Sequence, residues 1–232
     1  MDRPVLYRRP VQRKADRRRA KARRPYRLAS ERLWAAERLR RRARGRGVAR
    51  IRIPGRTPIR ERPYEPSDRS RFGEWEADSV IGAGCNLHTE VERRTRFLMA
   101  RIVPDKTADA SVAAQIAMFS ALPAGARTGV THDNGTEFAR HGRLHERLGM
   151  ATYFADPYSL CQRGGNENRN GAIRRHLPKR TRIDPSMAAD VQAIVDETDN
   201  RPMWVLGYRT PAEAFADELL ELTNEQGRCT SK

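Results

Sequence analysis

Three acidic residues, Asp78, Asp133 and Glu167, lie in sequence contexts that are unusual for carboxylates. Asp78 falls inside the stretch 75–81, whose pattern predicts a strand, and aspartate is disfavoured in strand interiors. Asp133 follows a short apolar strand, and ligands of α/β sheets usually bind at the carboxyl ends of strands. Glu167 opens a predicted helix that Gly171 weakens by roughly 1 kcal/mol. Such a local inconsistency often marks a functional site.

Each of the three carboxylates also has an ordinary explanation. Asp78 could face water at a strand edge, Asp133 could serve an Asp-Asn-Gly turn, and Glu167 could complement the helix dipole. Around one pocket, however, carboxylates would repel one another and raise each other's pKa values, and divalent cations remove that conflict. Mg²⁺ suits carboxylate oxygens, and two ions about 4 Å apart can activate a water or a 3′-hydroxyl. The set therefore predicts metal-dependent chemistry on a phosphodiester.

The elements that must position these residues form an alternating pattern. Strands are predicted at 75–81, 87–93, 97–103, 128–132 and 151–154, and helices at 109–122, 137–148, 167–177, 186–199 and 211–222. Ser186 and Thr210 are the predicted N-caps of the last two helices. Meander strands followed by crossovers indicate an α/β fold with a mixed five-stranded sheet flanked by helices.

Positive charge is concentrated at the start of the chain. The formal net charge is +17, yet residues 1–70 hold 25 Lys and Arg against 7 Asp and Glu, and the rest of the chain has a balance of −1. A basic segment binds a polyanion through counterion release, so we expect it to bind nucleic acid with an affinity that falls as salt rises. The alternatives are a solvated arm without a specific partner, ribosomal RNA and an anionic membrane. The arginines expected to contact DNA are Arg17, Arg18, Arg19, Arg23, Arg24, Arg40, Arg41 and Arg42.

Composition divides the chain into four parts. Residues 1–50 are an arginine-rich arm for which we expect disorder, and the prolines of residues 51–72 predict an extended linker. Residues 73–222 form the predicted catalytic domain, and residues 223–232 a flexible tail.

Neither a membrane nor a secretory route is indicated. No apolar run approaches the roughly 18 residues of a membrane helix, and the N-terminus does not have the pattern of a signal peptide. The scattered Cys85, Cys161 and Cys229 predict reduced thiols in a cytoplasmic protein.

Several motifs occur in a fixed order around the three carboxylates. They are Ile53-Pro54-Gly55-Arg56 through Glu61-Arg62-Pro63, Trp75-Glu76-Ala77-Asp78, Val91-Glu92-Arg93-Arg94-Thr95-Arg96, Asp133-Asn134-Gly135-Thr136-Glu137, Tyr153-Phe154-Ala155-Asp156-Pro157, Asn166-Glu167-Asn168, and Asn200-Arg201-Pro202 through Leu206-Gly207-Tyr208-Arg209-Thr210-Pro211-Ala212-Glu213. With 33 residues between Asp133 and Glu167, this set resembles the IS30-family transposases, part of the wider group of DDE transposases and retroviral integrases. The resemblance covers about residues 51–217.

The resemblance implies an RNase H-like fold, with Asp78 on the first strand, Asp133 after the fourth and Glu167 on a helix. It also implies two Mg²⁺ or Mn²⁺ ions held by these three catalytic residues, and DNA strand cleavage followed by strand transfer. The implied partners are the ends of an insertion sequence, target DNA and further copies of the chain, at the nucleoid of the cytoplasm. Arg174, seven residues after Glu167, and Lys179 are the expected DNA contacts outside the arm; a solvated side chain is the alternative for Arg174.

The chain departs from the family pattern in two places. Family members usually begin with helix-turn-helix regions, whereas residues 1–50 read as an arginine-rich tract, which suggests a truncated or altered copy. The family's Pro-Trp-Gln-Arg-Gly before the glutamate is replaced by Leu160-Cys161-Gln162-Arg163-Gly164. Two alternative functions therefore remain open: a non-catalytic nucleic-acid-binding remnant, and a nuclease that only hydrolyses DNA.

Overall fold

A mixed five-stranded sheet forms the centre of the protein in the computed structural model, which describes residues 53–65, 67–156, 162 and 164–229. The strands are β1 (Glu74–Val80), β3 (Asn86–Glu92), β4 (Leu98–Val103), β5 (Gly129–His132) and β6 (Ala151–Phe154). Their order is β4-β3-β1-β5-β6. The meander β1-β3-β4 is antiparallel, whereas β5 and β6 run parallel to β1. The predicted mixed five-stranded sheet is therefore confirmed.

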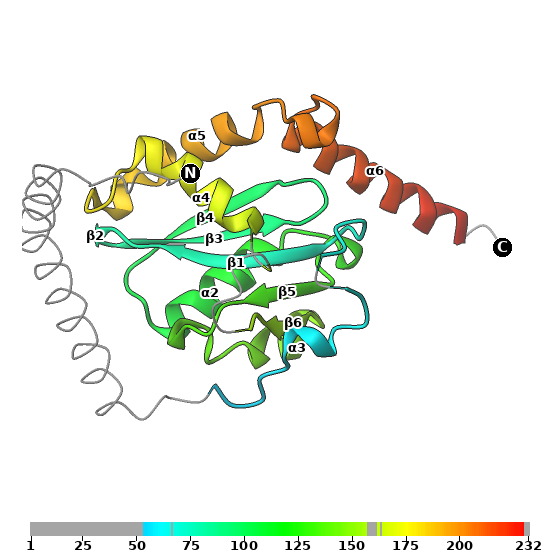
Figure 1. The fold of residues 1–232 in the computed structure, drawn as a ribbon, viewed down its shortest axis with the longest axis horizontal. Coiled ribbons are helices and arrows are strands. Elements are labelled where there is room, and N and C mark those ends of the chain that lie inside the picture. The colour runs from blue at the N-terminus through cyan, green and yellow to red at the C-terminus, as the bar shows by residue number, and fades with distance from the viewer. Residues whose placement is uncertain (1–52, 66, 157–161, 163, 230–232) are drawn as a thin grey trace, which may run out of the picture. The chain divides into compact units, whose positions relative to one another are not determined.

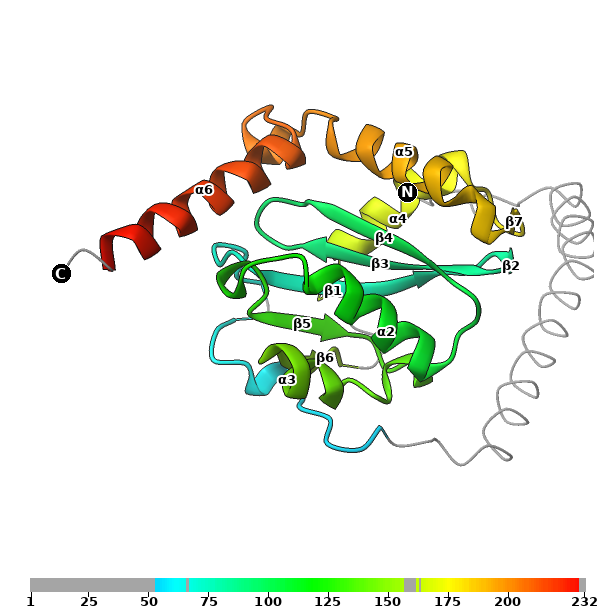
Figure 2. The same ribbon diagram turned by 180° about the vertical axis from the view of Figure 1, so that it is seen from behind.

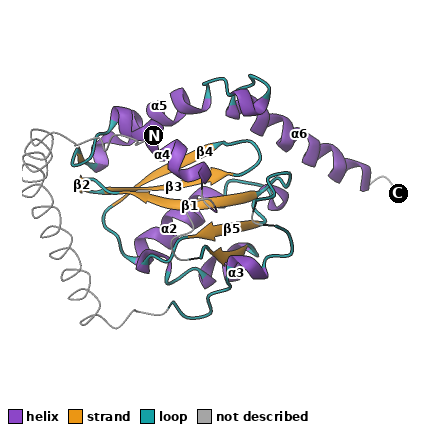
Figure 3. Cartoon of the chain, viewed as in Figure 1, coloured by secondary structure: helices purple, strands orange, loops and turns teal. Residues whose placement is uncertain are grey.

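Helices cover both faces of the sheet (Figures 1 and 2). The α-helices are α2 (Ala108–Phe119), α3 (Gly142–Leu148), α4 (Gly164–His176), α5 (Ala188–Asp199) and α6 (Pro211–Cys229). The 3-10 helices are η1 (Ile59–Glu61), η2 (Ala124–Ala126), η3 (Thr136–Phe138), η5 (Pro185–Met187) and η6 (Trp204–Leu206), and a small second sheet pairs β2 (Ala83–Gly84) with β7 (Arg182–Ile183). Figure 3 shows the strands enclosed between these helices.

The alternation of side chains along β1 separates two apolar cores. Trp75 and Ala77 point to the face covered by α2, where they join Phe119. Val80 points to the opposite face, where it packs with Ile173 of α4 and with residues of α5. Because successive side chains of a strand point to opposite faces, Glu74, Glu76 and Asp78 share the face of α4. The period of two in β1 thus decides which helix meets the predicted catalytic aspartate.

Helix boundaries differ from the sequence prediction in several places, including the end of α2, which is Phe119 instead of residue 122. The predicted helix 137–148 is divided into η3 and α3, with Gly142, a weak helix former, at the start of α3. Helix α4 begins at Gly164 rather than at Glu167. Ser186 lies within η5, and α5 begins at Ala188 without a side-chain cap, so the predicted cap is wrong. Helix α6 continues past Leu222 to Cys229.

The predicted N-cap of α6 is confirmed. Thr210 Oγ1 accepts from the N–H of Glu213 at 3.2 Å, and the Glu213 carboxylate accepts from the N–H of Thr210 at 2.9 Å. This reciprocal pair is a capping box, which satisfies two backbone donors at the start of the helix.

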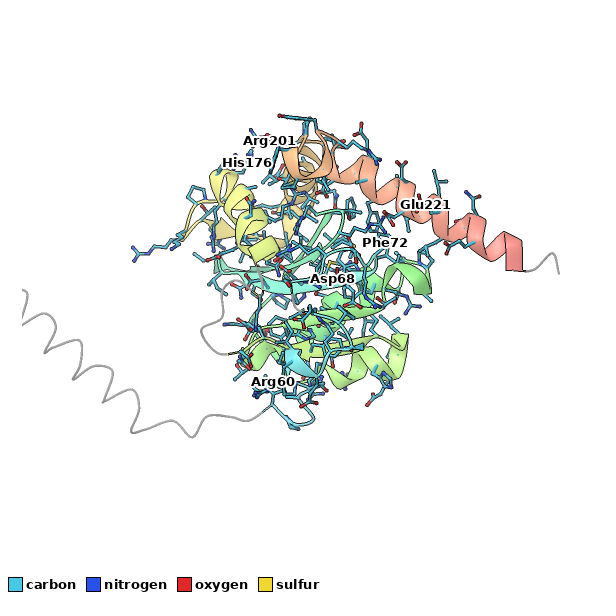
Figure 4. The ribbon with its side chains drawn as sticks, turned by 45° about the vertical axis from the view of Figure 1, so that its right-hand side comes forward. Arg60, Asp68, Phe72, His176, Arg201 and Glu221 are labelled. Atoms are coloured by element: carbon cyan, nitrogen blue, oxygen red, sulfur yellow. The ribbon has the colours of Figure 1, made fainter. Side chains whose placement is uncertain are left out.

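The segment 53–72, predicted as a linker, packs against the domain instead. Ile53 and Ile59 are buried, and Pro58 forms a parallel bridge with Phe154 at the end of β6. The prolines prevent this segment from continuing a regular strand, but they do not prevent its apolar side chains from joining the core. Figure 4 labels Arg60, Asp68 and Phe72 along it. No helix in the described part of the chain has the length and apolar character that a membrane crossing requires.

Candidate active site at the carboxyl ends of two parallel strands

Asp78 and Asp133 lie at matching positions on neighbouring parallel strands. The ladder between β1 and β5 pairs Glu74 with Gly129 and ends at Glu76 with Thr131. Continued by two residues, the same register places Asp78 beside Asp133, which follows the last residue of β5. Neighbouring strands are about 4.8 Å apart, and residues in register point to the same face. Extended in this way, the register brings the two positions to the carboxyl end of β5, on the face covered by α4.

Asp78 is oriented by amide groups from two directions. The backbone N–H of Ser79 donates to Oδ1 at 2.8 Å, and Asn170 Nδ2 on α4 donates to Oδ2 at 2.9 Å. Thr89, the partner of Asp78 on β3, donates from Oγ1 to Asn170 Oδ1 at 3.1 Å. These contacts connect β1, β3 and α4 around one carboxylate.

Asp133 begins a tight turn that brings a second acidic side chain close to it. Its Oδ1 accepts from the N–H of Gly135 at 2.7 Å, and Asn134 Nδ2 donates to the carbonyl of Ala155 at 2.8 Å. A Cβ at Gly135 would overlap Glu137 Oε2 and would lie 2.8 Å from Asp133 Oδ1. A larger residue here would displace one or both of these carboxylates. Buried Glu137 forms an ion pair with Lys106 at 3.0 Å.

Glu167 lies in the first turn of α4 and is exposed. The start of this helix is held against β1 because the N–H of Asn166 donates to Glu76 Oε2 at 3.1 Å. A Cβ at Gly165 would lie 2.8 Å from the same oxygen, so this approach requires a glycine. Asn170, which holds Asp78, is three residues after Glu167, and residues at this spacing are neighbours on a helix surface. The turn that carries Glu167 thus lies next to the two aspartates.

The donor set fits a hard divalent cation in chemical type. Asp78, Asp133 and Glu167 offer carboxylate oxygens, which Mg²⁺ and Mn²⁺ prefer. Among the residues that the structure describes, however, no three His, Cys, Asp or Glu side chains form a group that could hold a metal ion. The fold therefore brings the three positions to one end of the sheet without a preassembled three-ligand cluster.

Glu76, which the sequence analysis did not select, organises the interior beside this site. Its fully buried carboxylate lies 3.3 Å from Arg93 Nε and 3.8 Å from Arg69 Nη2. A charge buried this deeply requires a partner of opposite sign. The period of two in β1 places Glu76 on the face of Asp78, but the sequence does not indicate that Arg69 and Arg93 meet it.

A second buried polar network lies behind the site, on the face of α2. Glu90 Oε1 accepts from Gln115 Nε2 at 2.7 Å and lies 2.8 Å from His88 Nε2. Gln115 Nε2 also lies 3.0 Å from Nε2 of His132, the residue before Asp133. This network joins β3, α2 and the end of β5, and it was also missed by the sequence analysis, because its members are distant in the chain.

Two further buried carboxylates have raised pKa values. Burial raises the pKa of Glu92 to about 7, although hydrogen bonds from Thr95, Arg94 and Gly73 oppose the shift. Burial also raises the pKa of Asp199 to about 7, with the neighbouring guanidinium of Arg169 acting in the opposite direction. Because burial removes water from the charged form, both groups favour the neutral acid.

The predicted DNA contacts differ in their surroundings, and only Arg174 and Lys179 of them lie among the described residues. Arg174 donates to the carbonyl of Ile81 at 2.7 Å and to the carbonyls of Leu177 and Pro178, so it caps the ends of β1 and α4 rather than standing free in solvent. Lys179 is exposed. The eight arm arginines named above lie outside the described residues, as does most of the Leu160–Arg163 stretch that departs from the family pattern.

The structure describes the side chain of one of the three cysteines. Cys85 is a free thiol, whereas Cys161 and the side chain of Cys229 lie outside the described residues.

Several curated transposases are similar to this chain in sequence. The transposase of insertion sequence IS1086 from Cupriavidus metallidurans is 36% identical over 184 residues, which cover 78% of this chain and 54% of that protein. The IS30C transposase InsI of Escherichia coli is 35% identical over 164 residues, covering 70% of this chain and 43% of the relative. The transposase of IS4351 from Bacteroides fragilis is 36% identical over 174 residues, covering 74% and 52%.

This chain is a relative of the IS30-type transposases. It spans about half the length of the curated transposases that it matches. No family model matches the sequence. The catalytic core of BIV integrase superposes with a TM-score of 0.50 at 18% identity, covering 66% of this chain and 98% of that core. The RNase H-like fold implied by the resemblance is thereby confirmed.

Proposed function

We propose that this IS30-type chain carries the catalytic core of a DNA transposase, in which Asp78, Asp133 and Glu167 hold two Mg²⁺ or Mn²⁺ ions. The observation that supports this most directly is the parallel register of β1 and β5, which aligns Asp78 with Asp133 when it is extended by two residues, together with the hydrogen bond from Asn170 of α4 to Asp78. When bound, the two ions would supply an activated attacking oxygen and stabilisation of the leaving oxygen.

The chain's own residues position and orient the ligands. Asn170 and the N–H of Ser79 fix both oxygens of Asp78, and Gly135 fixes one oxygen of Asp133. Glu167 is exposed on a helix whose start is anchored to Glu76. In this proposal the two aspartates form the fixed part of the site, and the exposed Glu167 side chain completes it when metal and DNA bind.

The proposed substrates are the ends of an insertion sequence and a target DNA. Joining two ends to one target needs two active sites, so we propose that at least two copies assemble on DNA. Action on chromosomal DNA would place the protein at the nucleoid of the cytoplasm.

The test is metal-dependent cleavage of a DNA duplex that carries an element end. Asp78→Asn, Asp133→Asn and Glu167→Gln are each expected to lower the cleavage rate about 1,000-fold or more, because each removes a charged metal ligand. The rate is measured with Mn²⁺ on end-labelled DNA, together with the circular dichroism spectrum of each variant.

The matched control is Asp109→Asn, a carboxylate on the exposed surface of α2 that pairs with Arg140. It should cleave at the wild-type rate. Wild-type cleavage by any of the three site variants would refute the assignment of that residue.

Two other functions remain as distinguishable outcomes. A DNA-binding remnant would bind the duplex and show no metal-dependent cleavage in the wild-type chain. A purely hydrolytic nuclease would cut the duplex but would never join a labelled 3′-hydroxyl end to target DNA.

A further inference from the structure

The segment 53–72, which we name the arginine strap, contacts β6, β5 and β1 in turn. It contacts the end of β6 through Pro58 and the end of β5 through Arg62, which donates to Thr131 Oγ1 at 3.3 Å. Farther along, Arg69 reaches Glu76 on β1. The strap therefore reaches β1 two residues before Asp78, on the same face of the sheet.

Two strap arginines are committed to packing. The guanidinium of Arg62 lies 4.5 Å from the centre of the Tyr64 ring, and that of Arg71 lies 4.4 Å from it. Cations at this distance from an aromatic ring are held by its electrons. These two side chains stabilise the strap itself.

Arg56 is placed differently. Its side chain is exposed, and its guanidinium donates to Oδ1 of Asn134, the residue after Asp133. Asn134 is itself anchored to the carbonyl of Ala155. A guanidinium has five N–H donors in a rigid fork, so the anchored group can still donate toward a ligand at the Asp133 turn.

Arg69 lies on the other side of the site, beside the start of α4. Its Nη2 is 3.8 Å from Glu76 Oε1, too far for a hydrogen bond, and its buried Nη1 has no hydrogen-bond partner among the residues that the structure describes. A Cβ at Gly165 would lie 3.4 Å from this Nη1. This nitrogen therefore keeps donor capacity that the described residues do not use.

We infer that Arg56 and Arg69 clamp backbone phosphates of the DNA strand on either side of the three carboxylates. This inference rests on the proposed function and adds to it the residues that hold the substrate. A polyanion that approaches three carboxylates is repelled unless cations stand nearby, and the planar guanidinium fork matches a phosphate in geometry. Arg56 beside Asp133 and Arg69 beside the turn of Glu167 supply one such fork at each side.

The experiment combines arginine variants with single neutral phosphates. Equilibrium binding of the full chain to an element-end duplex is measured in EDTA, which prevents cleavage, with one methylphosphonate placed at each position around the cleavage site. Arg56→Ala and Arg69→Ala are each expected to raise the Kd about tenfold, as for the loss of one charged hydrogen bond. For each arginine, one methylphosphonate position should raise the Kd of the wild type about tenfold and leave that of the variant unchanged. Arg101→Ala, on the exposed edge strand β4, is the matched control and should respond to every methylphosphonate as the wild type does.

The clamp would be overturned if, for both arginines, every methylphosphonate raised the Kd of the alanine variant by the same factor as that of the wild type. If Arg69→Ala does not fold, Arg69→Lys replaces it, because lysine keeps the charge beside Glu76 and loses the fork. The proposed function is tested separately, and it fails if the wild-type chain does not cleave DNA in Mn²⁺. The binding measurements in EDTA test the phosphate contacts of Arg56 and Arg69 whether or not the chain cleaves.

Discussion

Glu76 and Asp78 lie two residues apart on the same face of β1, yet they meet different surroundings. Glu76 is fully buried and lies beside the guanidinium groups of Arg93 and Arg69. Asp78 is partly exposed, two residues before the end of the strand, and accepts hydrogen bonds from the amides of Asn170 and Ser79. The same type of side chain, on the same strand face, is thus buried beside two guanidinium groups in one place, and partly exposed with two amide donors in the other.

The difference teaches what each carboxylate can do. A guanidinium beside a buried carboxylate offsets its charge, so Glu76 is suited to holding β1, β3 and α4 together. The amides on Asp78 fix the direction of its two carboxylate oxygens, and partial exposure leaves this carboxylate open to solvent. We therefore expect substitutions at Glu76 to act on stability and substitutions at Asp78 to act on catalysis.

The largest expected effect on stability comes from Glu76→Gln. The change leaves Arg93 buried beside a neutral group, and breaking a buried ion pair costs about 3 to 5 kcal/mol. The paired change Asp78→Asn should alter the free energy of unfolding by less than about 1 kcal/mol, because Asp78 is partly exposed and an asparagine oxygen still accepts in part from Ser79 and Asn170. Urea unfolding followed by circular dichroism measures both. Equal losses for the two variants would remove the distinction between the residues.

The next largest effect is on the pH dependence of stability, and it comes from a third carboxylate, the buried Glu92. Glu92 accepts hydrogen bonds from Gly73 and from Thr95, and its burial raises its pKa to about 7 from an ordinary value of 4.5. Between these pH values the folded state holds more protons than the unfolded state, so the stability from this group is complete below pH 4.5. As the pH rises to 7, the free energy of unfolding should fall by about 3 kcal/mol.

Glu92→Gln should remove the contribution of Glu92 to the fall in the free energy of unfolding with rising pH, as measured by urea unfolding from pH 4 to pH 8. Some slope should remain, because burial also raises the pKa of Asp199 to about 7. Exposed Glu146 supplies the control, and Glu146→Gln should keep the wild-type profile. An unchanged slope in Glu92→Gln would show that burial does not control the protonation of Glu92.

The smallest expected effect is that of Asn170→Ala on cleavage. Removing the amide that holds Asp78 Oδ2 leaves the carboxylate present but less well oriented, and loss of a residue that orients a metal ligand typically costs about 10- to 100-fold in affinity or activity. The apparent affinity for Mn²⁺ in the cleavage assay should fall within this range, whereas the folding free energy should change by about 1 kcal/mol. Asn168→Ala, an exposed neighbour on α4, is the control. Wild-type metal dependence in Asn170→Ala would mean that this hydrogen bond does not position Asp78.

Much of the fold could be predicted from local pattern. The five strands follow from runs of apolar and β-branched residues, and the capping box at Thr210 follows from residue types three positions apart. The prolines of residues 53–72 correctly indicate an irregular backbone, but they carry no information on whether that backbone packs against the domain. The prediction of Ser186 as an N-cap is wrong because a 3-10 turn that begins with Pro185 precedes the helix.

The sequence by itself determined that Asp78, Asp133 and Glu167 stand in three ordered motifs, since residue type, spacing and local period are properties of the chain alone. Only the tertiary structure decided that β1 and β5 are parallel neighbours whose register aligns the two aspartates, and that α4 lies against β1 through Glu76. It also decided that Arg56 and Arg69 reach the site from a segment that contains no regular strand. The physical reason is that these arrangements depend on burial and on ion pairs between residues far apart in the chain, which no local pattern encodes.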